Sequence, residues 1–371
     1  MHYSLGINGR FLSQPLTGVQ RYARCWVKAL DHLLVSEEIV RSSWQATLYV
    51  PKGAHVKAAL TELNLKAIQI KRVGFSKGYL WEQLELPIYA RDQVLVNLGN
   101  MAPIPSLMSP QKTVVTIHDL SFQKFPESYS RLYQLTYTLL TPLIMARADA
   151  ILTVSQTEAK AILEVYPQAK SRVHPIPNGH WPDDLDLEAI APMNPIGRPF
   201  MLAVGTLSAR KNLTGILKAA ELVNQQQSLD FVMVGGRPSI YQAIQLELPA
   251  SLKDRVHFVG TVDDSTLISY YKAAQGLVYP SFYEASGLPP LEAMACGCPV
   301  IVSDIPALVE RCSDAALYCQ AQAPETIANG ILQLINNLEL QQDLRVKGDQ
   351  LAQALTWKNS VQQAMNVIAS C

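Results

Sequence analysis

The sequence predicts an α/β protein built from two doubly wound domains, each with its own parallel sheet. Short apolar runs alternate with amphipathic helical stretches along the whole chain, which is the pattern of parallel sheets covered by helices. The 371 residues suffice for two ordinary domains. A proline-rich stretch at residues 177–199 interrupts the alternation near the middle of the chain, as expected for a linker.

The predicted strands divide into two groups around this linker. Those of the first group are Ser4–Ile7, Thr47–Val50, Ala67–Ile70, Val94–Leu98, Val114–Ile117, Ile151–Val154 and Val173–Ile176. Those of the second group are Phe200–Val204, Phe231–Val234, Val256–Val259, Leu277–Tyr279, Val300–Val302 and Leu317–Cys319. We therefore expect one domain over residues 1–180 and another over 181–355, with a ligand at the carboxyl ends of their strands.

The composition is that of a globular protein, with 49% hydrophobic and 17% charged residues. The first ten residues alternate like a strand and not like a secretory leader. No uninterrupted apolar run approaches the ~20 residues that cross a membrane. The six cysteines lack the spacing of metal ligands, so we expect buried, reduced thiols in a cytoplasmic protein.

The charges are distributed unevenly although they sum to zero. Residues 1–180 carry 19 Lys and Arg against 12 Asp and Glu, and residues 181–371 carry the reverse. This asymmetry predicts an anionic partner for the first half, such as a membrane surface or a lipid diphosphate, with ordinary charge scatter as the alternative. No nucleic-acid partner is expected. The candidate residues for a membrane-facing or acceptor surface, which could equally form a solvated loop, are Lys71, Arg72, Phe75, Lys77, Tyr79 and Trp81.

The strongest chemical signal lies in residues 281–304, where a turn and a short helix join two apolar strands. Glu284 lies in the loop and Glu292 in what we expect to be the first helical turn. Between them lie Ser286, Gly287 and Leu288, whose amides at a helix start attract phosphate. The two carboxylates repel phosphate but accept hydrogen bonds from sugar hydroxyls. This combination predicts a nucleotide-sugar pocket.

These residues also carry a family resemblance. Glu284, seven residues, Glu292 and the following Ala-Met-Ala-Cys-Gly-Cys-Pro-Val resemble the signature of retaining glycosyltransferases of family 4, which have the GT-B fold. The resemblance implies two Rossmann-like domains facing a cleft, with a final helix, residues 356–371, returning to the first domain. It also implies retaining transfer of a hexose from a nucleotide-diphosphate sugar. Where family members often have Glu-Gly-Phe-Gly, this chain has Glu-Ala-Ser-Gly from Glu284.

The loop after Val204 supplies two cations, Arg210 and Lys211. An arginine binds a diphosphate as a fork and a lysine binds it as a point charge, so we assign both to the leaving group. The Gly-Arg pair common in the family is Gly205-Thr206 here, and we expect Arg210 to supply the missing guanidinium. By resemblance, the backbone around Val259 and Thr261 holds the base of the donor.

In the first half, His118 follows a buried strand, and residues 117–120 resemble the family segment whose histidine touches the transferred sugar. Asp119 is expected either to orient nearby backbone or to meet the acceptor. Gly18, at a helix entrance, is expected to offer its amide to the diphosphate. Ser155 is predicted to cap the next helix in a capping box with Glu158. His118, Arg210, Lys211 and Glu284 are thus the expected catalytic residues.

No metal or cofactor is required by these motifs. The Asp184-Leu185-Asp186 sequence has the form used by metal-dependent transferases, but it lies in the linker and is interpreted as solvated. Residues 210–213 and 17–22 most resemble bacterial polysaccharide mannosyltransferases, which favours GDP-mannose as the donor and a glycan or lipid-linked acceptor. GDP-rhamnose, UDP-glucose and dTDP-rhamnose stay open as donors. A nucleotide-sugar epimerase and a catalytically silent binding protein are the competing classes.

Overall fold

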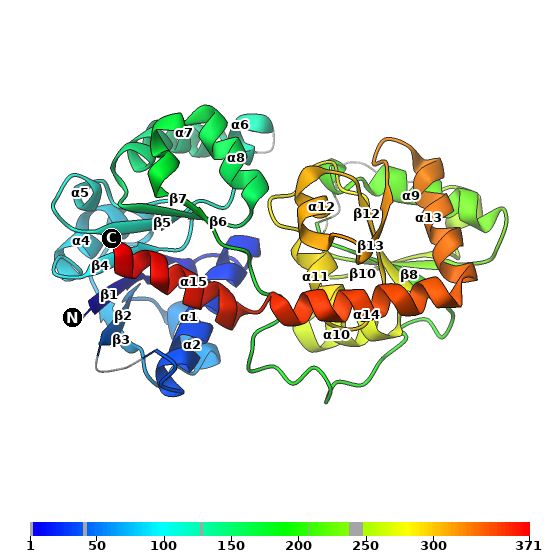
Figure 1. The fold of residues 1–371 in the computed structure, drawn as a ribbon, viewed down its shortest axis with the longest axis horizontal. Helices are drawn as coiled ribbons and strands as arrows, with labels where there is room; N and C mark the ends of the chain where they lie inside the picture. Colours follow the sequence, from blue (N-terminus) through cyan, green and yellow to red (C-terminus); the bar gives the residue numbers. More distant parts are fainter. Residues whose placement is uncertain (1–2, 40–42, 127–128, 207, 237–247) are drawn as a thin grey trace. The chain divides into compact units, whose positions relative to one another are not determined.

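A computed structural model describes residues 3–39, 43–126, 129–206, 208–236 and 248–371. The chain divides into two compact units (Figure 1). Unit 1 comprises Met1–Asp183 and Trp357–Cys371, and unit 2 comprises Asp184–Thr356.

Unit 1 is built on a parallel sheet with the strand order β3-β2-β1-β4-β5-β6-β7. Its strands are β1 (Tyr3–Asn8), β2 (Trp44–Pro51), β3 (Gln69–Val73), β4 (Val94–Asn97), β5 (Thr113–Thr116), β6 (Ala150–Thr153) and β7 (Val173–Pro175). Its helices are α1 (Gly18–Val35), α2 (Ala54–Leu63), α3 (Gly78–Leu80), α4 (Leu86–Tyr89), α5 (Ile104–Leu107), α6 (Ser121–Lys124), α7 (Arg131–Arg147), α8 (Gln156–Val165) and α15 (Trp357–Ser370). A π-helical turn, Trp81–Glu85, joins α3 to α4.

Unit 2 has a second parallel sheet with the order β10-β9-β8-β11-β12-β13. Its strands are β8 (Phe200–Val204), β9 (Asp230–Val234), β10 (Val256–Gly260), β11 (Gly276–Tyr279), β12 (Val300–Ser303) and β13 (Ala316–Cys319). Its helices are α9 (Leu213–Asn224), α10 (Asp264–Ala273), α11 (Leu288–Met294), α12 (Pro306–Cys312), α13 (Pro324–Asn336) and α14 (Leu338–Ala354). The predicted α/β class with two doubly wound sheets is confirmed.

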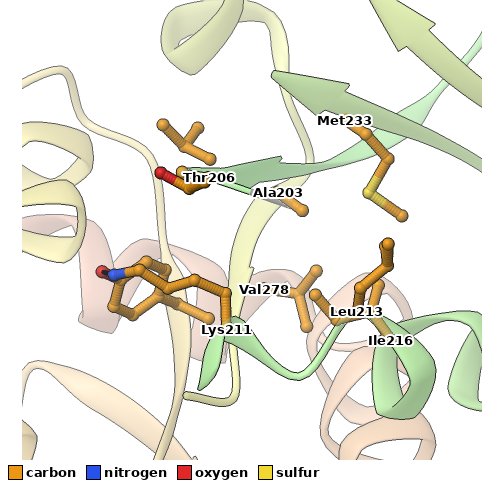
Figure 2. Close-up of a pocket in the computed structure, with 10 residues that line it drawn as sticks. Ala203, Thr206, Lys211, Leu213, Ile216, Met233 and Val278 are labelled. Atoms are coloured by element: carbon orange, nitrogen blue, oxygen red, sulfur yellow. Dashed lines mark hydrogen bonds between the residues drawn. The ribbon is translucent and has the colours of Figure 1, made fainter. Parts of the chain in front are cut away.

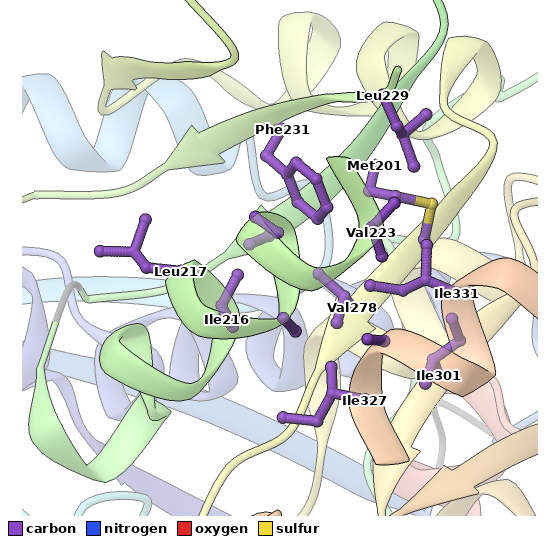
Figure 3. Close-up of a cluster of buried hydrophobic side chains, with 14 of the residues drawn as sticks. Met201, Ile216, Leu217, Val223, Leu229, Phe231, Val278, Ile301, Ile327 and Ile331 are labelled. Atoms are coloured by element: carbon purple, nitrogen blue, oxygen red, sulfur yellow. The ribbon is translucent and has the colours of Figure 1, made fainter. Parts of the chain in front are cut away.

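The core of unit 2 forms where α9 and α13 pack on the sheet. Figure 3 shows Ile216 and Val223 from α9 and Ile331 from α13 directed toward Phe231 and Val278 of the strands. The central strands are buried on both faces, which explains why they read as continuous apolar runs and not as alternating ones.

Every predicted strand overlaps an observed one, but β3 begins two residues later than expected. The carboxylate of Asp31 accepts hydrogen bonds from the amides of Lys66, Ala67 and Ile68, at 2.7–2.8 Å. These donors are therefore satisfied by a buried side chain of α1 and do not enter the sheet.

Three further predictions from the sequence concern a helix cap, a tryptophan and the cysteines. Ser155 Oγ accepts a hydrogen bond from the amide of Glu158 at 3.1 Å, as predicted for the helix cap. Trp81 was placed wrongly at the surface: it is 0% exposed, and its indole donates to the carbonyl of Val73. Its large apolar ring fills the core beneath β2 and β4, an environment that local sequence does not report. The predicted buried free thiols are confirmed for Cys25, Cys296, Cys298, Cys312 and Cys319, whereas Cys371 is half-buried.

The linker between Pro175 and Phe200 contains neither helix nor strand. It is anchored in unit 1 by aromatic contacts, since the Trp357 indole donates to the carbonyl of His180 at 3.0 Å and the Arg21 guanidinium lies over the Trp181 ring. Asp186 lies exposed and accepts two amide hydrogen bonds from its own loop. Within the described residues, no helix has both the length and the hydropathy needed to cross a bilayer.

Candidate active site

Both sheets reverse their strand order once, in unit 1 between β1 and β4 and in unit 2 between β8 and β11. In doubly wound folds, ligands bind outside the carboxyl ends of the strands at such a point. A ligand site is therefore expected among the residues that follow these four strands.

In unit 2, three neighbouring strands each lead into or end in a glycine with positive φ. The angles are +132° at Gly205, +142° at Gly235 and +74° at Gly260. A Cβ atom on Gly235 would lie 1.9 Å from the carbonyl oxygen of Gly205, so the two backbones leave no room for a side chain. The edge of the sheet thus presents bare backbone, to which a ligand can approach closely.

The loop after β8 is held against the loop after β11 by Asn212. This residue adopts the left-handed conformation, with φ +59°, and caps α9 by accepting from the amide of Gly215. Its side-chain amide donates to the carbonyls of Pro280 and Ala321, at 3.1 and 2.6 Å. These bonds set the position of its neighbour Lys211. Leu207, in the same loop, lies outside the described residues.

Lys211 reaches across the switch point and pairs with Glu284, one of the residues expected at the sugar. Its ammonium donates to the Glu284 carboxylate and to the hydroxyl of Tyr279. Both charged side chains are largely buried, with 16% and 9% of their surfaces exposed. Burial alone would raise the pKa of Glu284, but attraction to Lys211 and Arg210 holds it below its ordinary value. Burial lowers the pKa of Lys211, and the charge of Glu284 opposes that shift.

A small pocket opens beside this pair. Its lining residues come from β8, β9, α9 and β11 and from the loop after β8, and they are Ala203, Val204, Gly205, Thr206, Lys211, Leu213, Ile216, Met233, Val278 and Tyr279. Figure 2 shows Thr206 and the amino end of Lys211 on one side of it, and Met233, Leu213 and Ile216 on the other. The pocket therefore has one polar and one apolar end.

Arg210 differs from its neighbour because its side chain is exposed. Its carbonyl accepts from the amide of Phe282 at 3.0 Å, which joins the two loops a second time. Because its guanidinium also lowers the pKa of Glu284, the two predicted cations and this carboxylate belong to one electrostatic cluster.

The turn before α11 is held from behind by a residue that sequence reasoning missed, Arg311 of α12. Its buried guanidinium donates to the carbonyl and the hydroxyl of Ser286, at 2.6 and 2.5 Å. Burial lowers the pKa of Arg311 to about 10. The sequence feature that could have indicated this buried role is the position of Arg311 on the apolar face of α12, beside Leu308 and Cys312.

Gly287 and Leu288 form the start of α11. Gly287 has φ +69° and caps the helix, and a Cβ there would lie 2.7 Å from Leu308 Cδ2. Glu292 is buried, but the expectation that it lies in the first turn is wrong. The helix starts at Leu288, directly after the left-handed glycine, so Glu292 is its fifth residue and lies in the second turn.

Val259 and Thr261 flank Gly260 at the end of β10, two strands from β8. Val259 is half-buried and Thr261 is exposed. They share the carboxyl edge of the sheet with the Lys211 cluster.

In unit 1, His118 is buried two residues after the end of β5. Its Nε2 donates to the carbonyl of Leu98 at 3.0 Å, and its ring meets Tyr22 edge to face, 4.6 Å between centroids. Burial lowers the pKa of His118, so the ring is neutral near pH 7 and Nδ1 is the nitrogen left to accept from a ligand. Asp119 accepts from the amide of Ser121, which fits the first of the two roles expected for it, while the contact with an acceptor stays a prediction. Gly18, the first residue of α1, is exposed, and a Cβ atom there would point into open space.

The switch point of unit 1 holds a buried polar network that sequence reasoning also missed. Asn8 donates to Glu82 at 2.7 Å and to Asn97 at 2.9 Å, and Arg10 pairs with Glu82 at 3.1 Å. Burial raises the pKa of Glu82, against the attraction of Arg10. The Arg10 guanidinium also lies 4.2 Å from the ring centre of Tyr79. Polar residues at the ends of two apolar strands were the available signal.

The pairing of Lys211 with Glu284 predicts how stability depends on pH. Because the folded state lowers the pKa of Glu284, its carboxylate contributes stability that is complete above the ordinary value of 4.5 and is lost as the pH falls through the lower folded value. Urea unfolding of the wild type and of Glu284→Gln should therefore give free energies that converge toward acid pH. A difference that stays constant from neutral to acid pH would contradict an ionised pair.

Two family models match the chain, one on each unit. The model described as "Glycosyl transferases group 1" matches residues 190–350, and the one described as "Glycosyltransferase Family 4" matches residues 97–183. O-antigen chain mannosyltransferase B of Escherichia coli is 28% identical over 271 residues, covering 69% of this chain and 70% of its own. O-antigen chain mannosyltransferase RfbU of Salmonella typhimurium is 27% identical over 320 residues, covering 84% and 85%.

Solved structures establish the fold. HepE of Anabaena, in complex with UDP and glucose, aligns with a TM-score of 0.73 at 18% identity over 100% of both chains. WaaG, a glycosyltransferase involved in lipopolysaccharide biosynthesis, aligns with a TM-score of 0.66 at 17% identity over 99% of this chain and 100% of its own. With the GT-B architecture confirmed and a glycosyltransferase model on each unit, the chain belongs to the group 1 glycosyltransferases.

Proposed function

We propose that this glycosyltransferase moves mannose from GDP-mannose to a hydroxyl of a glycan or lipid-linked acceptor in cell-surface polysaccharide synthesis, with retention of anomeric configuration. The two O-antigen mannosyltransferases support the sugar and the process. The UDP and glucose in the HepE structure do not argue for a donor here, because 18% identity carries the fold alone. UDP-glucose, dTDP-rhamnose and GDP-rhamnose are the alternative donors.

The single observation that carries the chemistry is the buried Lys211–Glu284 pair beside the pocket. In this proposal Lys211, joined by Arg210, neutralises the departing diphosphate, and Glu284 accepts a hydroxyl of the hexose. A cation held in place with little water around it stabilises developing charge strongly, because the low dielectric does not screen it. Within unit 2, the amides of residues 286–288 and of Gly205-Thr206 complete the phosphate site. Gly18 of unit 1 keeps its assignment to the diphosphate by family resemblance alone. Glu292 takes the ribose hydroxyls, and backbone at Val259 and Thr261 takes the base.

The proposed reaction proceeds without a covalent intermediate, because Glu284 is assigned to a sugar hydroxyl and Glu292 to the ribose, so neither carboxylate is assigned as a nucleophile. The bond between the sugar C1 and the diphosphate oxygen loosens, and the acceptor oxygen bonds to C1 on the same face. The acceptor proton passes to the departing phosphate oxygen. No metal or other cofactor takes part, because Arg210 and Lys211 meet the phosphate charge. His118 is assigned to the sugar by family resemblance, and Nδ1 is the ring nitrogen that the bond to Leu98 leaves for this contact.

The test combines donor binding with product analysis. A thermal-shift panel of GDP, UDP and dTDP sugars, with and without EDTA, should give a selective, EDTA-insensitive shift with GDP-mannose. Proton NMR of the product should give the α-anomer, as in the donor. A shift only with UDP or dTDP sugars would replace the donor, and an inverted anomer would overturn the mechanism. A changed sugar configuration with the nucleotide still attached would indicate an epimerase. Donor binding without hydrolysis or transfer would indicate a catalytically silent binding protein.

Arg210→Ala should weaken donor binding and kcat/KM by about 10- to 100-fold, the range of a lost hydrogen bond to a charged group. The matched control is Lys253→Ala, which removes another exposed cation of unit 2 at the amino end of β10. Isothermal calorimetry with GDP and initial rates check both variants. Unchanged affinity and turnover in Arg210→Ala would remove this residue from the site.

A further inference from the structure

We propose that unit 1 docks on an anionic lipid bilayer through one apolar face, whose centre is the outer side of α7. We call this surface the leucine face. It consists of Leu80, Leu84, Ile88, Leu132, Leu135 and Leu139. The candidate membrane residues named from the sequence lie between Lys71 and Trp81. That segment includes Leu80 of the leucine face, but none of the six candidates is itself part of the face.

The helix α7 is apolar on both sides although only one side is covered. Its inner side, with Tyr137, Ile144 and Met145, lies in the core of unit 1. On the outer side Leu132, Leu135 and Leu139 are 76%, 59% and 65% exposed.

The spacing of three and four residues places these leucines in one row. Between Arg131 and Arg147 the helix has no charged residue. A helix on the surface of a globular protein normally turns charged or polar residues to solvent. The outer side of α7 therefore has the chemistry of a surface that something covers.

A second row of exposed apolar residues lies along the segment from α3 to α4. Leu80, Leu84 and Ile88 recur every four residues, and each is more than half exposed. Tyr79 and Tyr89, at the two ends of this row, are also exposed. Tyrosine suits the boundary between lipid and water, because its ring is apolar and its hydroxyl is polar.

Both rows lie on the same side of the sheet. The connections β3 to β4, β4 to β5 and β5 to β6 all run in one direction across the sheet, and right-handed crossovers place their helices on one face. Figure 1 agrees, with α4, α5 and α7 on one side of unit 1 and α1, α2 and α15 on the other. The short helix α5 contacts both α7 and the π-helical turn. Ile104 at its start and Met108 just after its end are exposed as well.

The charges around the leucine face select lipid over a protein partner. Arg131 and Arg147 are exposed at the two ends of α7, and Lys77 is exposed just before Leu80. The two acidic residues of the α3–α4 segment have partners of their own. Glu82 is buried in an ion pair with Arg10, and the Glu85 carboxylate accepts hydrogen bonds from the amides of Phe75 and Ser76. An apolar centre with a cationic rim matches the acyl region and the anionic headgroups of a bilayer.

Vesicle sedimentation of the full-length protein tests the proposal without any sugar donor. The wild type should bind phosphatidylglycerol-containing vesicles at low salt, and bind pure phosphatidylcholine vesicles less. Replacing Leu132, Leu135 and Leu139 together by glutamine, a good helix former, should weaken binding at least about tenfold. The matched control replaces Leu338 and Val346, exposed apolar residues of α14 in unit 2, by glutamine and should bind like the wild type. Arg131→Gln with Arg147→Gln should reduce both the binding and its salt sensitivity.

Failure of the wild type to bind anionic vesicles, or equal binding by the triple glutamine variant, would overturn the proposal. A wild type that is dimeric by light scattering, with a monomeric triple variant, would assign the leucine face to a second copy of the chain instead. Circular dichroism checks that the variants are folded. Because the measurement uses no nucleotide sugar, its failure would leave the proposed transferase activity untouched, and the reverse also holds.

Discussion

Lys211→Met is expected to lower kcat/KM for sugar transfer by about 10²–10³-fold, the range seen when one preorganised donor to a developing negative charge is removed. The substitution keeps the length and the apolar stem of the side chain while deleting the ammonium that binds Glu284 and Tyr279. Initial rates with saturating and limiting donor separate the effect on kcat from the effect on KM. A loss confined to KM would mean that Lys211 binds ground state and transition state equally.

The same variant should also unfold more easily, because it leaves the Glu284 carboxylate buried without its cation. Breaking a buried ion pair from one side costs about 3–5 kcal/mol. The double variant Lys211→Met with Glu284→Gln removes the stranded charge and should recover most of that stability in urea unfolding, while activity stays lost. If activity returned together with stability, Lys211 would be a structural residue and not a catalytic one.

Gly235→Ala is expected to destabilise unit 2 by at least about 3 kcal/mol and to abolish transfer with it. The new Cβ would lie 1.9 Å from the carbonyl oxygen of Gly205, a backbone atom that cannot turn aside like a side chain. The residue also has φ +142°, a conformation that alanine rarely adopts. The ends of β8 and β9 would have to separate, and with them the loop that carries Lys211.

Gly236→Ala is the matched control for this prediction. A Cβ at Gly236 would meet Thr261 Cγ2 at 3.6 Å, an ordinary contact, so its stability should stay within about 1 kcal/mol of the wild type. Urea unfolding and transfer rates of the two alanine variants make the comparison. Similar behaviour of both would show that the close approach of β8 and β9 does not depend on glycine.

Most of the fold could be predicted because its signals are local. The strands of both sheets are short apolar runs bounded by polar residues, and Ser155 caps α8 within three residues of sequence. Lys211 and Glu284 were each noticed from their place after a strand, but their pairing across 73 residues was not foreseen. β3 shifted because its expected first residues donate to Asp31, which lies 35–37 residues away.

What escaped sequence reasoning are polar groups satisfied by distant partners and apolar groups whose surroundings depend on chain crossings. Arg311 serves Ser286 from the next helix, and Asn8 joins Glu82 and Asn97 from three separate elements. Trp81 is buried while Leu132 and Leu135 are exposed, although all three are apolar residues in helical segments. A hydrophobic pattern records which residues favour burial, but the packing of the whole unit determines which of them are covered. The strands and the site motifs could therefore be predicted from the sequence, whereas the supporting contacts and the leucine face could be identified only in the folded structure.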